Sequence, residues 1–250
     1  MNWKDAMGFV STLTFLLPII IIFALRLQRL KCFLALAIYY LLSFSSNLMA
    51  ENYIHVSADF KRFFGIINNL MELPLIFTFM AYFSLSPLFA KRIRHAVLIF
   101  LLFEVIVTLI LGFNKTSMII IMAPGLSLIL FFTIWFSLRQ IKITITQGKS
   151  TGKALMISSL LFAYSCYALI YILFYLLKSQ EISDIFVMYF FAGTLSTLVL
   201  SAGIMIENKR IKKLEELKIT RKELSMIYGE SSGEKTTSVK IAFIEKENWN

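Results

Sequence analysis

The chain alternates long apolar blocks with short polar segments. A helix needs about 20 apolar residues to cross a bilayer, and seven blocks reach or approach that length. They cover residues 8–25, 32–50, 64–85, 95–112, 117–138, 154–177 and 184–206. The pattern predicts an all-α membrane protein, a seven-transmembrane helix bundle within residues 1–206.

Basic residues are distributed unevenly among the connecting segments. If the N-terminus lies outside, the inner loops 26–31, 86–94 and 139–153 hold ten Lys or Arg and no acidic residue, whereas the outer segments hold five of each sign. Short cytoplasmic loops carry an excess of Lys and Arg, so the chain is predicted to lie N-out and C-in as a multi-pass protein of the plasma (inner) membrane. Only Lys4 precedes the first block, which favours a retained helix over a signal peptide.

The overall composition agrees with this class. The chain is 58% hydrophobic, with a mean hydropathy of +0.75 and a net charge of +10, while soluble domains are about 45–50% apolar. The bilayer itself, and anionic inner-leaflet lipids facing the basic loops, account for the charge without a nucleic-acid partner. Cys32 and Cys166 fall within or at the edge of apolar blocks and are predicted to be buried thiols.

The remainder of the chain is polar and is predicted to be cytoplasmic. Residues 207–228 form an amphipathic pattern, which either lies on anionic lipid or forms a short coiled coil. The coiled coil would join two copies as a homodimer or contact a cytoplasmic signalling partner. Residues 229–250 are predicted to be a flexible tail: 229–238 are typical of a linker, and 239–250 alternate like a strand that is disordered or adds to another protein's sheet.

Two acidic residues lie inside predicted spans. Ionisable residues are costly in a membrane and are functional candidates by default. Glu72 lies eight residues from Phe64, and Glu104 lies eight residues from Gly112. Both carboxyls are therefore about 12 Å below the outer surface, although their helices run in opposite directions.

Other polar side chains gather at the same level. Asn68 and Asn69 share a helix face with Glu72, Asn47 lies in the outer half of block 32–50, and a row of tyrosines follows block 154–177. The pattern predicts an outward-facing polar pocket between blocks 32–50, 64–85, 95–112 and 154–177. Its predicted ligand-binding residues are Asn47, Asn68, Asn69, Glu72, Glu104, Tyr164 and Tyr167. The alternative is that these groups only bond helix to helix, at about 0.6 kcal/mol each.

Prolines and one outer loop complete the candidates. Pro18, Pro74 and Pro124 each remove a backbone hydrogen bond and favour a kink in their helix. Glu51, His55 and Asp59 would share a face and could bind a divalent metal if their loop were helical. The local sequence instead favours a solvated loop, so neither a metal nor a cofactor is predicted.

Three stretches carry a resemblance to a known group. They are IYYLLSFSSNL at 38–48, INNLMELPLIFTFMAYF at 67–83 and the Ser- and Tyr-rich block 154–177. Over residues 10–210 the chain resembles poorly characterised bacterial seven-helix proteins that look like detached membrane halves of sensor kinases. The resemblance implies a membrane sensor or accessory signalling component, and it brings no catalytic residues.

Three functions therefore stay open besides a purely structural subunit. The first is a sensor that binds a small ligand or a proton in the outer pocket. The second is a small-solute transporter that uses the same pocket, although few polar residues are expected in its inner half. The third is an intramembrane acid–base hydrolase that uses Glu72 and Glu104 as paired carboxyls.

Overall fold

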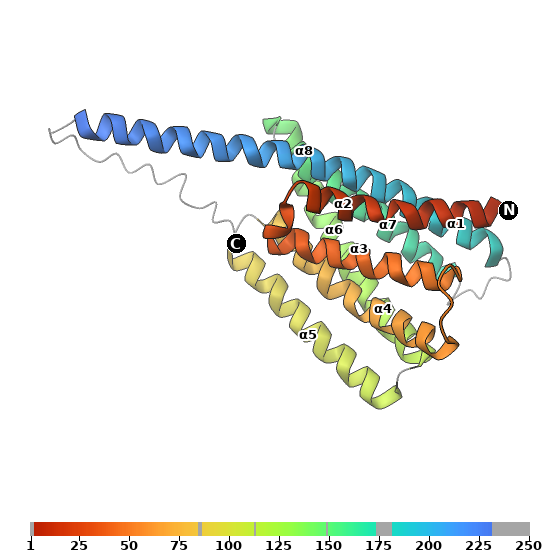
Figure 1. Cartoon of the computed structure of the whole chain (residues 1–250). Helices are drawn as coiled ribbons and strands as arrows, with labels where there is room; N and C mark the ends of the chain where they lie inside the picture. Colours follow the sequence, from red (N-terminus) through yellow and green to blue (C-terminus); the bar gives the residue numbers. More distant parts are fainter. Residues whose placement is uncertain (1–2, 85–86, 113, 149, 174–181, 232–250) are drawn as a thin grey trace.

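The computed structural model describes residues 3–84, 87–112, 114–148, 150–173 and 182–231. Every regular element in these ranges is helical (Figure 1). Seven of the helical segments are long and apolar enough to cross a membrane. The predicted all-α architecture, with seven helices long and apolar enough to cross a membrane, is thus confirmed.

The helices follow the predicted blocks, with several longer than expected. The elements are α1 (Trp3–Thr14), α2 (Leu16–Ala24), η1 (Leu27–Arg29), α3 (Lys31–Ala50), α4 (Ala58–Met80), η2 (Ala81–Phe83), α5 (Pro87–Leu111), α6 (Lys115–Gln147), α7 (Thr151–Tyr171) and α8 (Ile182–Ser231). Figure 1 shows the chain beginning at one end of the bundle, here called the N-terminal end, while α8 projects from the opposite end. The predicted first span corresponds to α1 and α2 together.

A proline explains the interruption of that first span. Pro18 has no N–H to donate to the carbonyl of Thr14, and Phe15, between α1 and α2, instead donates to the Thr12 carbonyl at 3.2 Å. A missing i to i−4 bond of this kind breaks or kinks a helix. α4 and α6 continue through Pro74 and Pro124, so the predicted effect of proline appears as a break only in the first span.

Local chemistry sets several helix ends. The Ser57 hydroxyl accepts from the Phe60 N–H at the start of α4, and Asn114 and Ser117 form a capping box at the start of α6. These side chains satisfy backbone donors that have no partner within the helix. Gly148 ends α6 with a φ of 61°, a left-handed conformation that glycine adopts without steric cost.

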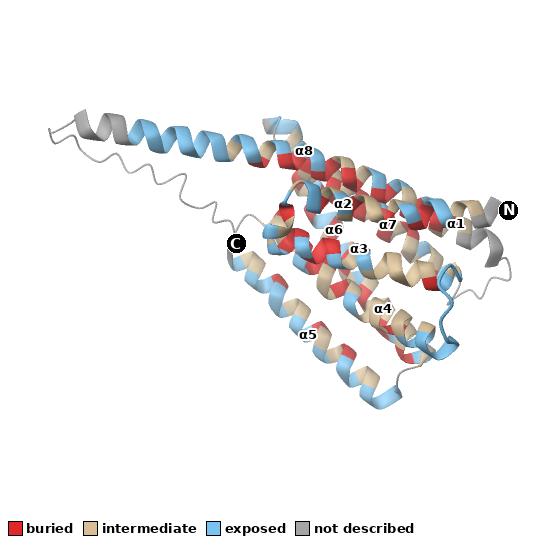
Figure 2. Ribbon diagram, in the orientation of Figure 1, coloured by how far each residue is buried: buried red, intermediate tan, exposed pale blue. Residues whose placement is uncertain are grey.

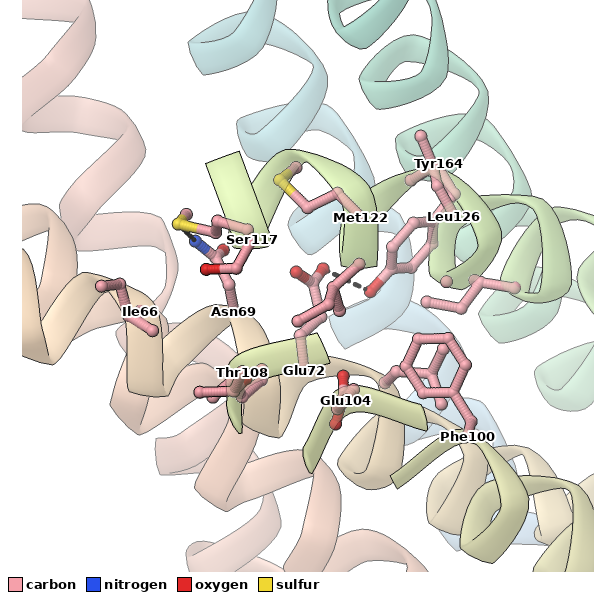
Figure 3. A pocket seen from close by; sticks show the side chains of 16 residues that line it. Ile66, Asn69, Glu72, Phe100, Glu104, Thr108, Ser117, Met122, Leu126 and Tyr164 are labelled. Atoms are coloured by element: carbon pink, nitrogen blue, oxygen red, sulfur yellow. Dashed lines mark hydrogen bonds between the residues drawn. The ribbon is translucent and has the colours of Figure 1, made fainter. Parts of the chain in front are cut away.

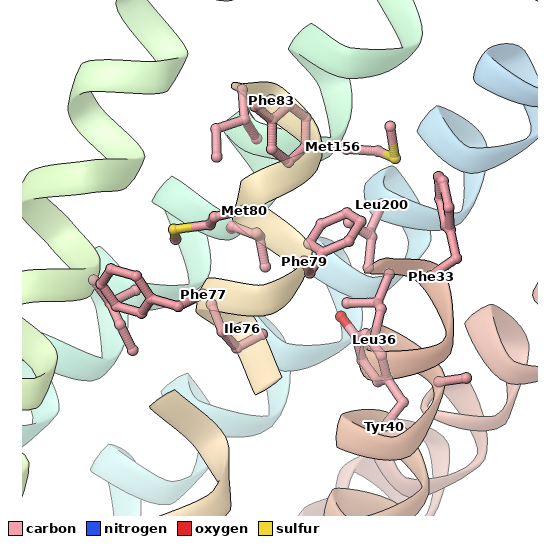
Figure 4. Close-up of a cluster of buried hydrophobic side chains, with 14 of the residues drawn as sticks. Phe33, Leu36, Tyr40, Ile76, Phe77, Phe79, Met80, Phe83, Met156 and Leu200 are labelled. Carbon is pink, nitrogen blue, oxygen red and sulfur yellow. The ribbon is translucent and has the colours of Figure 1, made fainter. Parts of the chain in front are cut away.

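The core lies where α3, α4, α7 and α8 meet. Figure 4 shows Phe33, Phe79, Met156 and Leu200 from these four helices packed together, and each is fully buried. α5 is different, because much of its apolar surface is exposed (Figure 2), with Leu109 at 79%. Exposed apolar surface of this extent suits contact with lipid, so α5 is the most peripheral of the crossing helices.

α7 and α8 approach each other unusually closely. A Cβ added at Gly152 of α7 would lie 2.7 Å from the backbone nitrogen of Glu207, and one added at Gly203 of α8 would lie 2.7 Å from the Cγ of Met156. Small residues allow membrane helices to pack backbone against backbone. The two glycines therefore fix α7 and α8 as a tightly joined pair.

α8 is one continuous helix of 50 residues, about 75 Å long at the usual rise. It passes without a break through residue 207, where the cytoplasmic segment was predicted to begin. Side chains remain buried as far as Ile211, and residues 215–225 are exposed. The strand-like pattern at 239–250 lies outside the described residues.

Candidate functional site

Glu72 is the centre of a polar cluster between three helices. The hydroxyl of Tyr164, from α7, donates to Glu72 Oε1 at 2.8 Å (Figure 3). The hydroxyl of Tyr39, from α3, approaches the same oxygen at 3.4 Å. Tyr164 is 1% exposed. Hydrogen bonds to a charged acceptor contribute more than neutral ones, about 1.5–3 kcal/mol, so the carboxyl ties α3, α4 and α7 together at one point.

A cavity of about 50 Å³ lies beside Glu72. Its walls come from α4, α5 and α6, with Tyr164 supplied by α7. Figure 3 shows the Glu72 and Glu104 side chains entering this space from neighbouring helices. Glu104 is 4% exposed, and within the described ranges no hydrogen bond or ion pair reaches it. The cavity therefore contains a buried carboxyl that has no protein partner there.

Four of the seven predicted binding residues line this cavity. They are Asn69, Glu72, Glu104 and Tyr164. The structure brings both carboxyls to one cavity, Glu72 from α4 and Glu104 from α5.

The other three predicted residues lie elsewhere. Asn47 and Asn68 are not in the cavity wall, and each has one buried amide atom without a hydrogen bond in the described part of the chain. Tyr167 packs edge-on against Tyr164, with ring centroids 5.7 Å apart. Helical periodicity identifies which residues share a face, but it does not show whether that face contacts another helix or lines a cavity.

The predicted wall also needs a correction. Block 32–50 was expected to line the pocket, but the structure places α6 there, with Ser117, Met118 and Gly125. α3 reaches Glu72 through Tyr39, which does not line the cavity. The order of helices around a bundle depends on tertiary packing. Nothing in the sequence of α6 therefore indicated that its residues line the cavity.

A row of tyrosine rings extends from the cluster to α8. Tyr167 contacts Tyr164 on one side and Tyr189 on the other, with centroids 5.2 Å apart in the second pair. Tyr189 belongs to α8. Aromatic pairs at these distances are favourable by about 0.5–1.5 kcal/mol beyond area burial. The row thus joins the Glu72 cluster to the helix that leaves the bundle.

A second charged cluster lies near the opposite end of the bundle. Glu207 is 0% exposed and receives the Tyr82 hydroxyl at 2.5 Å. The Arg210 Nε lies 3.0 Å from both Glu207 carboxylate oxygens, and the Lys153 ammonium lies 4.5 Å from the centre of the Tyr82 ring. The sequence predicts Glu207 to be the first residue after the seven-helix domain, whereas the structure buries it within the bundle. The spacing to Arg210, one helical turn later, is the sequence signal that could have identified the pair.

Polar groups are also buried on α6 beyond the cavity. Thr133, Ser137 and Gln140 are each less than 3% exposed. Ser137 lies 3.4 Å from Ser158 of α7, and neither side-chain polar atom of Gln140 has a partner in the described ranges. α6 therefore adds one buried amide, Gln140, to the few hydroxyls that the sequence predicts in this part of the bundle.

The loop between α3 and α4 brings no set of metal ligands together in the described residues. Residues 51–57 form turns and extended backbone, and Asp59 lies in the first turn of α4. In the described part of the chain no group of three or more His, Cys, Asp or Glu side chains is arranged to hold a metal ion. Cys32 and Cys166 are buried and free.

Comparisons with known proteins assign no family. No family model, no curated protein and no solved structure matches this chain. The resemblance to sensor-kinase membrane halves stays a prediction, and the geometry of the site has to carry the functional argument.

Proposed function

We propose that this protein is a sensor or accessory signalling protein of the bacterial plasma membrane, with its N-terminus outside and its C-terminus in the cytoplasm. A small ligand or a proton enters the cavity beside Glu72 and changes the position of α8. The observation that carries the proposal is the hydrogen bond from Tyr164 to Glu72, because it links the cavity to the α7–α8 pair.

The orientation rests on charge. Segments 26–31, 86–94 and 139–153 hold ten basic and no acidic residues. The start of α3 and the start of α5, which belong to two of these segments, lie at the end from which α8 projects (Figure 1). That end faces the cytoplasm under the rule for short loops. The cavity lies toward the other end, since Ser117 and Thr108 in its wall are close to the short connection between α5 and α6.

The route from cavity to output consists of direct contacts. Glu72 bonds to Tyr164, Tyr164 packs on Tyr167, and Tyr167 packs on Tyr189 of α8. α8 is also joined to α7 at Gly152. A ligand shifts such an equilibrium only if it interacts differently with two arrangements of the helices. Loss or reorientation of the Tyr164 bond is the difference that we assign to the two states.

The exposed part of α8 fits an output role. Residues 209–225 contain seven Lys or Arg and three Glu, and Leu217, Ile219 and Leu224 are exposed there. The helix therefore offers a basic and partly apolar surface to anionic lipid, a second copy or a signalling partner. A rotation or tilt of α8 would change how this surface contacts the lipid, the second copy or the signalling partner.

The experiment measures whether the site controls α8. Spin labels at Leu217 on α8 and Ile145 on α6, both exposed, report the distance between the two helices in nanodiscs, with Cys32 and Cys166 replaced by Ala. Tyr164→Phe removes the hydroxyl that bonds Glu72. The control is Tyr171→Phe, which removes a hydroxyl from the same helix, where it donates to the Ile119 carbonyl at 3.0 Å.

The proposal expects a shifted or broadened distance distribution for Tyr164→Phe and a wild-type distribution for Tyr171→Phe. Glu72→Gln should shift the distribution in the same direction as Tyr164→Phe, since it weakens the same bond. If all three variants keep the wild-type distribution, the cluster does not control α8 and the sensor proposal fails.

Transport is the second candidate, and one observation favours it. A carrier needs polar groups on both sides of its binding site, and Thr133, Ser137 and Gln140 supply them beyond the cavity. Solute flux into proteoliposomes that is abolished by Gln140→Leu as well as by Glu72→Gln would favour a carrier. Flux equal to that of empty liposomes would exclude it for the solute tested.

A further inference from the structure

The cavity wall is mostly apolar, but it holds two carboxyls and no basic side chain. Glu72 receives both tyrosine hydroxyls on Oε1, and in the described residues Oε2 accepts no hydrogen bond. Both oxygens of Glu104 are likewise without a donor there. None of the sixteen lining residues is Lys, Arg or His. Two carboxyls therefore face one small space with no positive group to balance them.

Neutral oxygens add to this wall. Asn69 donates its amide N–H to the sulfur of Met118 at 3.6 Å, which leaves its carbonyl oxygen without a donor from the described part of the chain. Thr108 also lines the cavity, and no hydrogen bond involving its hydroxyl is found in the same ranges. The space thus has up to five unoccupied oxygen acceptors on four side chains.

Burying an ionised carboxyl without compensation is expensive. A positive charge placed between Glu72 and Glu104 would lower that cost for both groups. Oxygen donors of this kind, carboxylate, amide carbonyl and hydroxyl, are those that hard cations prefer over the nitrogen and sulfur ligands of zinc or copper sites. At about 50 Å³ the cavity is too small for an extended organic ligand and has room for one ion with little water.

We propose that the cavity binds one small hard metal cation, of the sodium or calcium class, between Glu72 and Glu104. Asn69 and Thr108 supply neutral oxygens to the same ion. This inference rests on the proposed function, because it names the ligand whose binding would be sensed. Glu72 is also the acceptor of Tyr164, so an ion drawn to its carboxylate would compete with that bond and change the link to α8.

The test is direct ion binding to the full-length protein in nanodiscs. Radioactive sodium and radioactive calcium are titrated separately in a choline buffer of constant ionic strength, and the two arms decide the charge of the ion. Glu104→Gln keeps the shape of the side chain and removes its charge. The matched control is Glu216→Gln, at an exposed position on the projecting part of α8.

We expect saturable binding of one of the two ions to the wild type and to Glu216→Gln, and at least tenfold weaker binding to Glu104→Gln. Glu104→Asp, which keeps the charge on a shorter side chain, should fall between wild type and Gln and shows whether charge or packing matters. The melting temperature in choline alone confirms that each variant is folded.

Two outcomes overturn the inference. One is the absence of binding above the choline background for both ions, and the other is equal binding to wild type and Glu104→Gln. Either can occur while Tyr164→Phe still shifts α8, in which case the sensor proposal stands and its ligand is not a metal cation. The reverse pattern, ion binding with no shift of α8, refutes the sensor proposal and leaves the cation site in place.

Discussion

A methyl group at position 152 should force α7 and α8 apart. The added Cβ would lie 2.7 Å from the Glu207 nitrogen and 2.9 Å from its Cα, whereas ordinary contact begins at 3.4 Å. The obstructing atoms are backbone, so no rotamer change relieves the clash and the helices must separate by roughly 0.7 Å. Overpacking of this kind costs about 1–3 kcal/mol, while alanine regains about 1 kcal/mol of helix propensity over glycine. With the overpacking cost at the upper end of its range and the propensity gain subtracted, Gly152→Ala should lower the free energy of unfolding by about 2 kcal/mol.

Gly65→Ala is the matched control for this prediction. A Cβ at Gly65 in α4 meets nothing within 4 Å, so only the propensity gain applies and the protein should become about 0.5–1 kcal/mol more stable. Unfolding in mixed detergent–SDS micelles, followed by circular dichroism, measures both variants. The reasoning is refuted if Gly152→Ala is as stable as Gly65→Ala, because the close approach of α7 and α8 would then not exist.

Two further predictions concern the charged cluster and the first span. Arg210→Met leaves the fully buried Glu207 without its cation, so it should lower the free energy of unfolding by about 3 kcal/mol. The double variant Glu207→Leu, Arg210→Met should recover most of that loss in the same micelle assay, and additive losses would show that the two side chains do not act as a pair. Pro18→Ala supplies the missing N–H and should join α1 and α2, which slows amide hydrogen exchange at residues 15–19. Unchanged exchange would mean that packing, not the proline, breaks the helix.

Much of the candidate site was accessible from the sequence. Glu72 and Glu104 are candidates because an ionisable group inside an apolar block is costly to bury. The rise per residue of a helix alone places them at one depth. Tyr164 was found from its place in a row of tyrosines. Asn47 and Asn68 had the same kind of signal, yet the structure places them outside the cavity wall. Depth along a helix follows from counting residues, whereas the neighbour that a face meets does not.

Other features depended on contacts between helices. From the sequence Glu207 is the first residue of a polar tail. The structure buries it at 0% exposure because Tyr82 and the start of α7 at Gly152 pack against it. Gln140 looked like part of a loop with Arg139 and Lys142, and the structure buries it at 1%. Charged and amide side chains at the ends of apolar blocks are ambiguous, since only packing decides whether water reaches them.

The sequence alone determined that this chain is a bundle of membrane-crossing helices and where most of those helices lie, because the hydrophobic effect acts on each block separately. It also determined that two carboxyls share a depth. The tertiary structure decided which helices surround them: α6 rather than α3 completes the cavity, and α7 connects Glu72 to α8 through Tyr164. Lipid tails solvate every apolar helix face equally well, so the hydrophobic effect does not select which helices pack together. The order of the helices therefore follows from close packing at Gly152 and from a few buried polar bonds, which no periodicity in the sequence records.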